Sequence, residues 1–73
     1  MSMIYVVEDD RNISEIESFS LKNSGYDVAV YENAKDFYDA LKDRIPSLIL
    51  LDIMLPDEDG LSIVEKLRKD SLT

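Results

Sequence analysis

The chain of 73 residues contains no cysteine, no histidine and no tryptophan, and only two glycines and two prolines. Without cysteine there is no disulfide framework and no thiolate zinc site. Without histidine there is no imidazole for Ser-His-Asp or Cys-His catalysis, and the usual nitrogen ligand of catalytic zinc is missing. These absences exclude several classes of hydrolase and leave oxygen atoms as the ligands for any metal ion.

Positive charge is also scarce, because 8 Lys and Arg residues stand against 16 Asp and Glu residues, giving a formal net charge of −8. A surface this acidic lacks the cationic footprint that a nucleic-acid backbone requires, so we expect no nucleic-acid binding by this segment. No apolar run approaches the roughly 20 residues of a membrane span. Residues 1–7 lack the basic flank and the length of a signal peptide. We therefore expect a cytoplasmic protein that makes no membrane contact.

Three short apolar runs predict β-strands, over residues 3–7, 26–31 and 47–51. They are rich in β-branched, aromatic or aliphatic side chains and have few polar interruptions, which is typical of strands that are buried on both faces. Amphipathic segments alternate with these runs. This alternation predicts an α/β fold with a parallel sheet and right-handed crossovers.

The amphipathic segments predict three helices, over residues 12–24, 33–45 and 61–68. We expect Asn12 to be the N-cap of the first helix, with Ile13 and Ile16 on its apolar face. Asn33 is the predicted N-cap of the second helix. The predicted order of elements is therefore β-α-β-α-β-α.

Carboxylates directly follow two of the predicted strands: Glu8 and Asp9 after the first, with Asp10 next, and Asp52 after the third. In open α/β sheets, ligands bind beyond the carboxyl ends of the strands. If the two strands are neighbours, these carboxylates converge and repel one another unless a cation lies among them, and an all-oxygen site suits Mg²⁺ or Mn²⁺. A carboxylate beside a metal can also be a nucleophile toward phosphorus. Taken alone, each acid is more typical of a helix cap or a solvated loop, and it is the placement of both groups at strand ends that favours a site.

The segment after Asp52 is unusually apolar for a loop and then contains Pro56 and Gly60. Pro56 stiffens the backbone, and we expect Gly60 to adopt a positive φ before the third helix. A loop of this kind beside charged residues suggests that it shapes a site. An ordinary strand-to-helix turn is the alternative.

Together these segments resemble the N-terminal portion of a bacterial two-component response regulator, its receiver (phosphoacceptor) domain. The resemblance covers the whole chain and is carried by residues 6–10 (Val-Val-Glu-Asp-Asp), 24–26 (Ser-Gly-Tyr) and 51–60 (Leu-Asp-Ile-Met-Leu-Pro-Asp-Glu-Asp-Gly). It implies a three-layer, flavodoxin-like, doubly wound parallel sheet, truncated to three strands in the order 2-1-3.

The resemblance also implies a role for each residue of the acidic group. Asp52 matches the phosphoryl acceptor, which takes its phosphoryl group from a sensor histidine kinase. Asp9 matches the direct Mg²⁺ ligand, Glu8 is expected to act on the metal through water, and the backbone carbonyl of Met54 is expected to be the third protein ligand. Asp10 is expected to lie outside this set and to help start the first helix. Such a protein is a phosphorelay signalling domain and not an enzyme with turnover.

The resemblance further implies strands, a hydroxyl residue and a lysine that residues 1–73 do not supply. We therefore expect residues 1–73 to form a single incomplete receiver domain with no output domain and weak acceptor activity. The third strand is expected to be an exposed apolar edge, which favours a homo-oligomer in which this strand pairs with its copy.

Three alternatives are weighed against this interpretation. A Mg²⁺-dependent phosphohydrolase with an aspartyl nucleophile has a second aspartate two residues after the first, but position 54 is Met. A dinucleotide-binding half-domain needs glycines after the first strand, where this chain has acids at 8–10. The third alternative is an inert, self-associating fragment with a vestigial acidic site. A magnesium titration separates it from a working receiver.

Overall fold

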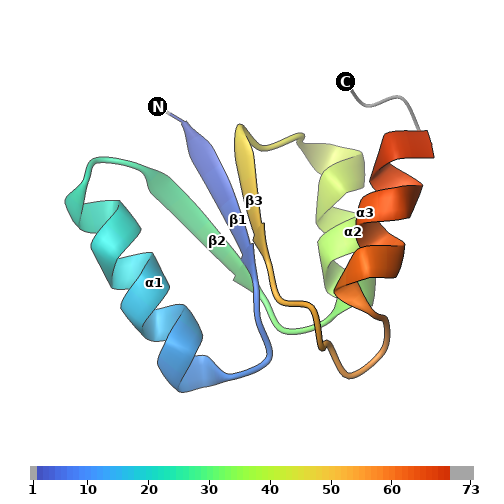
Figure 1. The fold of residues 1–73 in the computed structure, drawn as a ribbon. Helices are drawn as coiled ribbons and strands as arrows, with labels where there is room; N and C mark the ends of the chain where they lie inside the picture. Colours follow the sequence, from blue (N-terminus) through green and yellow to red (C-terminus); the bar gives the residue numbers. More distant parts are fainter. Residues whose placement is uncertain (1, 70–73) are drawn as a thin grey trace.

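The computed structural model describes residues 2–69 as a three-stranded parallel sheet with a helix after each strand. The strands are β1 (Met3–Val7), β2 (Asp27–Tyr31) and β3 (Leu48–Leu51), and they lie in the order β2-β1-β3 (Figure 1). The predicted flavodoxin-like α/β class and the strand order 2-1-3 are confirmed. β1 therefore lies in the centre of the sheet.

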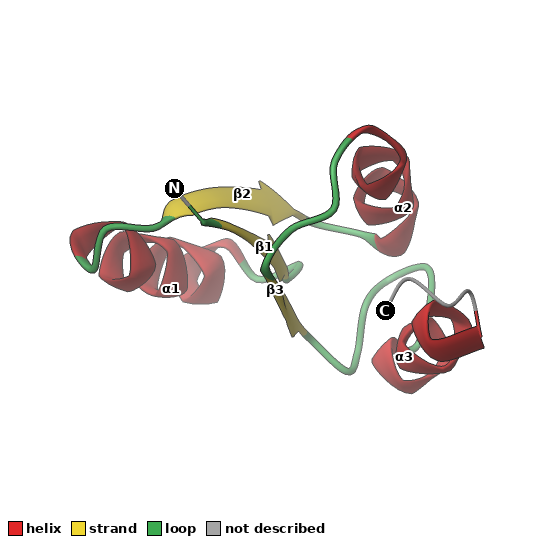
Figure 2. Cartoon of the chain, turned by 90° about the horizontal axis from the view of Figure 1, so that it is seen from above, coloured by secondary structure: helices red, strands yellow, loops and turns green. Residues whose placement is uncertain are grey.

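The helices are α1 (Arg11–Asn23), α2 (Ala34–Asp43) and α3 (Gly60–Lys69). Viewed along the sheet, α1 covers one face, and α2 and α3 cover the other, so the molecule has three layers (Figure 2). Each helix follows its strand at the same edge of the sheet. None of the helices in residues 2–69 is both long and apolar enough to cross a membrane.

The hydrophobic core is centred on β1, which is buried on both faces as its sequence predicts. Ile4 and Val6 are 3% and 0% exposed, and they alternate with residues that face the opposite layer. The main cluster of buried side chains lies between the sheet and helices α2 and α3. It consists of Tyr5, Val7, Ala34, Phe37 and Ile63.

The N-cap of α1 is Asp10 and not Asn12, so that prediction is wrong. The Asp10 carboxylate accepts hydrogen bonds from the amides of Asn12 and Ile13, at 2.9 and 3.3 Å. An aspartate is as good a cap as an asparagine, and the one that comes first in the chain satisfies the free N–H groups. The expectation that Asp10 starts the first helix is confirmed.

The face that α1 turns to the sheet also differs from the prediction. Ser14 is buried, whereas Ile13 and Ile16 are 46% and 71% exposed. The side chains of Glu17 and Ser18, one turn further along, are half-buried. The face of α1 that contacts the sheet is therefore polar over its first turns and continues to the half-buried Leu21.

Candidate functional site

The pairing of β1 with β3 brings the two groups of strand-end acids together. Val7 pairs with Leu51 in parallel register, and the amide of Asp52 donates to the carbonyl of Val7 at 2.9 Å. Glu8 and Asp52, the residues that follow this pair, therefore lie on neighbouring strands at the same edge of the sheet. A shift of one residue would turn the Asp52 side chain to the other face of the sheet.

Glu8, Asp9 and Asp52 form a compact acidic cluster at the carboxyl edge of the sheet. Each offers one carboxylate oxygen, and these oxygens all lie within 4.8 Å of one another. Glu8 and Asp52 are half-buried and Asp9 is exposed. Three converging carboxylate oxygens with no nitrogen or sulfur are the donor set of a hard divalent cation, so the residues present fit a metal site.

The proximity of Glu8 and Asp52 changes the proton affinity of both. Desolvation and the neighbouring Asp52 carboxylate raise the pKa of Glu8 above its ordinary value. The pKa of Asp52 is lowered, because its carboxylate accepts a hydrogen bond from the Glu8 carboxyl and another from the Met54 amide. Asp52 is therefore the more strongly ionised of the two.

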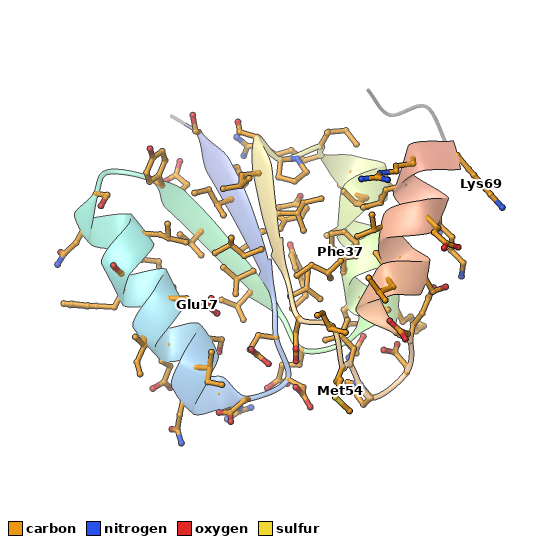
Figure 3. All side chains as sticks on the ribbon, viewed as in Figure 1. Glu17, Phe37, Met54 and Lys69 are labelled. Carbon is orange, nitrogen blue, oxygen red and sulfur yellow. The ribbon has the colours of Figure 1, made fainter. Side chains whose placement is uncertain are left out.

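The β3–α3 loop, residues 52–59, carries Met54, the predicted carbonyl ligand. The Met54 amide donates to Asp52 Oδ1 at 3.2 Å, and its side chain is 79% exposed at the lower edge of the view in Figure 3. Within residues 2–69, no hydrogen bond ends on the Met54 carbonyl oxygen. That oxygen therefore has a free lone pair two residues from Asp52.

Gly60 is required by a close approach of the backbone and not by a positive φ, which corrects the prediction. It is the first residue of α3, and the glycine with a positive φ is Gly25, at 95°. A Cβ atom added at Gly60 would lie 2.5 Å from the carbonyl oxygen of Asp52 and 2.8 Å from Cα of Ile53. The start of α3 is therefore packed directly against the acidic residue of the site.

Asp57 and Glu58 make contacts with α2 that the sequence pattern does not predict. The Asp57 carboxylate accepts from the amides of Ala34 and Lys35, and Glu58 contacts Tyr38, a residue of α2. Both contacts join residues 20 or more positions apart. Sequence patterns that span a few residues cannot predict such contacts, which are visible only in the folded structure.

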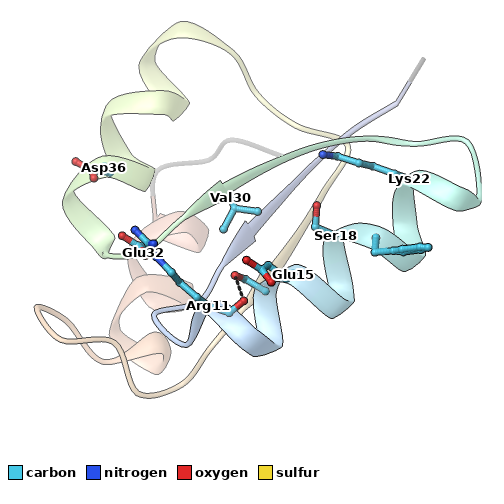
Figure 4. Close-up of a pocket in the computed structure, with 9 residues that line it drawn as sticks. Arg11, Glu15, Ser18, Lys22, Val30, Glu32 and Asp36 are labelled. Atoms are coloured by element: carbon cyan, nitrogen blue, oxygen red, sulfur yellow. Dashed lines mark hydrogen bonds and ion pairs between the residues drawn. The ribbon is translucent and has the colours of Figure 1, made fainter.

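Arg11 is turned away from the acidic cluster. Its Nε lies 3.0 Å from Glu32 Oε1, and the Arg11 side chain is 80% exposed. The pair lines a hollow of about 540 Å³ between α1 and β2, together with Glu15 and Lys22 (Figure 4). The hollow is open and is lined by charges of both signs. Arg11 therefore pairs with Glu32 there and not with the acidic cluster.

Comparison with known families agrees with this fold. The family model of the response regulator receiver domain matches residues 4–73. The chain therefore belongs to the response regulator receiver domains, which are signalling domains of two-component systems.

Solved structures of receiver domains are similar throughout the chain. Response regulator TrrA from Thermotoga maritima, solved in complex with Mg²⁺-BeF, is 31% identical with a TM-score of 0.90, over 97% of this chain and 62% of that one. The BeF3-activated N-terminal receiver domain of RstA from Klebsiella pneumoniae is 33% identical with a TM-score of 0.86, over 92% and 57%. A complex of histidine kinase ThkA with TrrA matches at 31% identity and a TM-score of 0.89, over 97% and 61%. The chain thus spans about three fifths of the chains it matches.

Proposed function

We propose that this chain is the phosphoacceptor part of a two-component phosphorelay and that Asp52 accepts a phosphoryl group from a sensor histidine kinase. The observation that carries the proposal is the Asp52 carboxylate, which is held at a strand end beside Glu8 and Asp9 and whose pKa is lowered. The solved complex of a similar response regulator with a histidine kinase supports the choice of partner. The cytoplasmic location expected from the sequence stays a prediction.

The proposed cofactor is Mg²⁺, with Mn²⁺ as the alternative. The residues that would hold it are Glu8, Asp9, Asp52 and the backbone carbonyl of Met54. When bound, the ion would offset the charge of the carboxylates and of an incoming phosphoryl group. The solved Mg²⁺-BeF complex of TrrA supports this choice.

In the proposed reaction an oxygen of the Asp52 carboxylate forms a new O–P bond. The bond from phosphorus to the donor nitrogen breaks, and the leaving imidazole keeps that electron pair. Glu8 and Asp9 do not react. The Met54 amide, which donates to Asp52 Oδ1, fixes one carboxylate oxygen and leaves the other for attack.

The test is labelling of the full chain with a small phosphoryl donor, such as acetyl phosphate, in the presence of Mg²⁺. We expect an acid-stable, base-labile acyl phosphate at Asp52, located by mass spectrometry of the digested chain. Asp52→Asn should not be labelled, whereas Asp59→Asn, a matched change in the same loop, should be labelled like the parent. Equal labelling of Asp52→Asn would refute the assignment.

The second candidate function is an inert, self-associating domain. Within residues 2–69, β3 pairs only with β1, and the side chain of Leu48 on this edge strand is 50% exposed. An apolar edge with free backbone groups is a template for strand pairing. Backbone NMR during a magnesium titration separates the candidates, since the inert one shows no shift at Asp9, Asp52 or Met54.

A further inference from the structure

The β3–α3 loop is held in place by a carboxylate that is not part of the acidic cluster. Asp57 Oδ1 accepts from the amide of Ala34 at 2.8 Å, and Asp57 Oδ2 accepts from the amide of Lys35 at 3.0 Å. These are the first two residues of α2, whose amides have no carbonyl partner within the helix. One loop residue thus satisfies two free donors of a helix that begins 23 positions earlier in the chain.

α2 already has an N-cap of its own. Asn33 Oδ1 accepts from the amide of Asp36 at 2.8 Å. The first and second amides of α2 therefore bond to the loop, and the third bonds to the cap. The hydrogen bonds from Ala34 and Lys35 lower the pKa of Asp57, so the carboxylate is ionised at neutral pH and lies at the positive end of the helix dipole.

Glu58 anchors the next position of the loop. Its Oε2 accepts from Lys66 Nζ at 2.8 Å, from Ser62 Oγ at 2.9 Å and from the Tyr38 hydroxyl at 3.2 Å. The Glu58 side chain is only 17% exposed. The loop is thus attached to α2 and to α3 at adjacent residues.

The other end of the loop is bonded to the site itself. The Gly60 amide donates to the carbonyl of Ile53 at 2.7 Å, which closes the loop at its base, and the Met54 amide donates to Asp52. Met54 lies between these bonds and the anchors at Asp57 and Glu58. Its carbonyl direction therefore depends on where the anchored half of the loop lies.

We propose that Asp57 is a positioning residue for the divalent-cation site. By holding the β3–α3 loop against the start of α2, it fixes the Met54 carbonyl relative to Asp52 without touching the cation. This rests on the proposed function, which makes that carbonyl a ligand. Residues that orient metal ligands from outside the coordination sphere commonly affect metal affinity strongly.

The test compares Asp57→Asn and Asp57→Ala with Asp36→Asn in the full chain, using magnesium chloride as the probe. Asp36→Asn is the matched control, because it removes the same charge from the same helix start without touching the loop. We expect Asp57→Asn to weaken Mg²⁺ binding by roughly 10-fold and Asp57→Ala by more. Asp36→Asn should change it by less than about 2-fold, because an exposed charge is screened by salt. Backbone NMR titration gives the dissociation constants, and thermal unfolding without Mg²⁺ gives the stability of each variant.

The outcomes separate this proposal from the proposed function. If Asp57→Asn and Asp36→Asn bind Mg²⁺ equally well while the parent binds it at Asp9 and Asp52, positioning by Asp57 is wrong and the cation site stands. If the parent shows no response to Mg²⁺, both are overturned. A loss of stability in Asp57→Asn with unchanged affinity also overturns the proposal, since it would show a purely structural cap. If Asp57→Ala fails to fold, Asp57→Asn decides, because it keeps one acceptor oxygen.

Discussion

Gly60 joins the acidic site to α3 through the closest backbone approach among the glycines of the chain. Its α carbon faces the carbonyl of Asp52, and no side chain fits between them. The position of Asp52 is therefore tied to the position of the helix that follows it. The absence of a side chain at Gly60, and not an unusual φ, permits this close approach to the Asp52 carbonyl.

We expect Gly60→Ala to lower the free energy of unfolding by about 1–3 kcal/mol, the usual cost of overpacking, despite the better helix propensity of alanine. Gly25→Ala is the control, because nothing lies within 4 Å of its added Cβ and only its positive φ is strained. Urea unfolding measures both. Backbone NMR should show shifts at Asp52 and Ile53 for Gly60→Ala alone, and a Gly60→Ala chain with parental stability and spectrum would contradict the close approach.

Glu58 should make stability depend on pH. Its pKa is lowered, first by the hydrogen bond from Lys66, so the folded state holds the ionised form more strongly than the unfolded chain does. The resulting stability is present above the unfolded pKa of about 4.3 and is lost as the pH falls through the lower folded value.

Glu58→Gln should therefore destabilise the chain by about 1 kcal/mol at neutral pH, and the difference should disappear in acid. Glu65→Gln, at an exposed acid on α3 next to Lys66, should have little effect at either pH. Urea unfolding at neutral and acidic pH measures both variants. A pH-independent loss in Glu58→Gln would assign the effect to packing instead of charge.

At the scale of elements, the hydrophobic pattern predicts every strand and helix described, because each strand is a short apolar run and each helix is an amphipathic segment. The pattern is less informative about helix faces. For α1 the sequence favours burial of Ile13 and Ile16, yet Ser14 faces the sheet. Which face is buried depends on the rotation of a helix against a particular sheet, and a weakly amphipathic helix specifies that rotation poorly.

The start of α1 offers a direct test of its cap. Asp10→Ala removes the acceptor for the amides of Asn12 and Ile13, so it should cost about 1 kcal/mol of stability. Asn12 is the second residue of α1, and Asn12→Ala should change the free energy of unfolding by no more than about 0.5 kcal/mol. Thermal unfolding of the two variants decides between the caps. A larger loss for Asn12→Ala would contradict the observed helix start.

At the scale of the whole molecule, the acidic site depends on register. The sequence predicts that Glu8, Asp9 and Asp52 end strands, and the strand order makes those strands neighbours. The contacts that Asp57 and Glu58 make with α2 could not be predicted, because they depend on where the β3–α3 loop lies against residues 20 or more positions earlier in the chain. The three clustered acids can thus be predicted from the strand ends, whereas the residues that hold the neighbouring loop in place cannot.

The exposed edge of β3 predicts self-association at micromolar concentration. Leu48→Lys puts a charge on that edge, so sedimentation equilibrium should give a lower mass than for the parent. Ile16→Lys makes the same kind of change on α1, where the side chain is 71% exposed, and should leave the parental mass unchanged. A compact monomeric parent would contradict pairing through β3, and an effect of Ile16→Lys alone would move the interface to α1.

The positions of the aromatic side chains determine which part of the molecule gives a near-ultraviolet spectroscopic signal. The chain has no tryptophan, and three of its four tyrosines belong to or pack against the core cluster under α2 and α3. Tyr5 meets Tyr31 and Phe37 edge-on, with ring centroids 5.1 and 6.4 Å apart. Near-ultraviolet dichroism therefore reports mainly on that layer, since the fourth tyrosine, Tyr26, is 43% exposed just after α1.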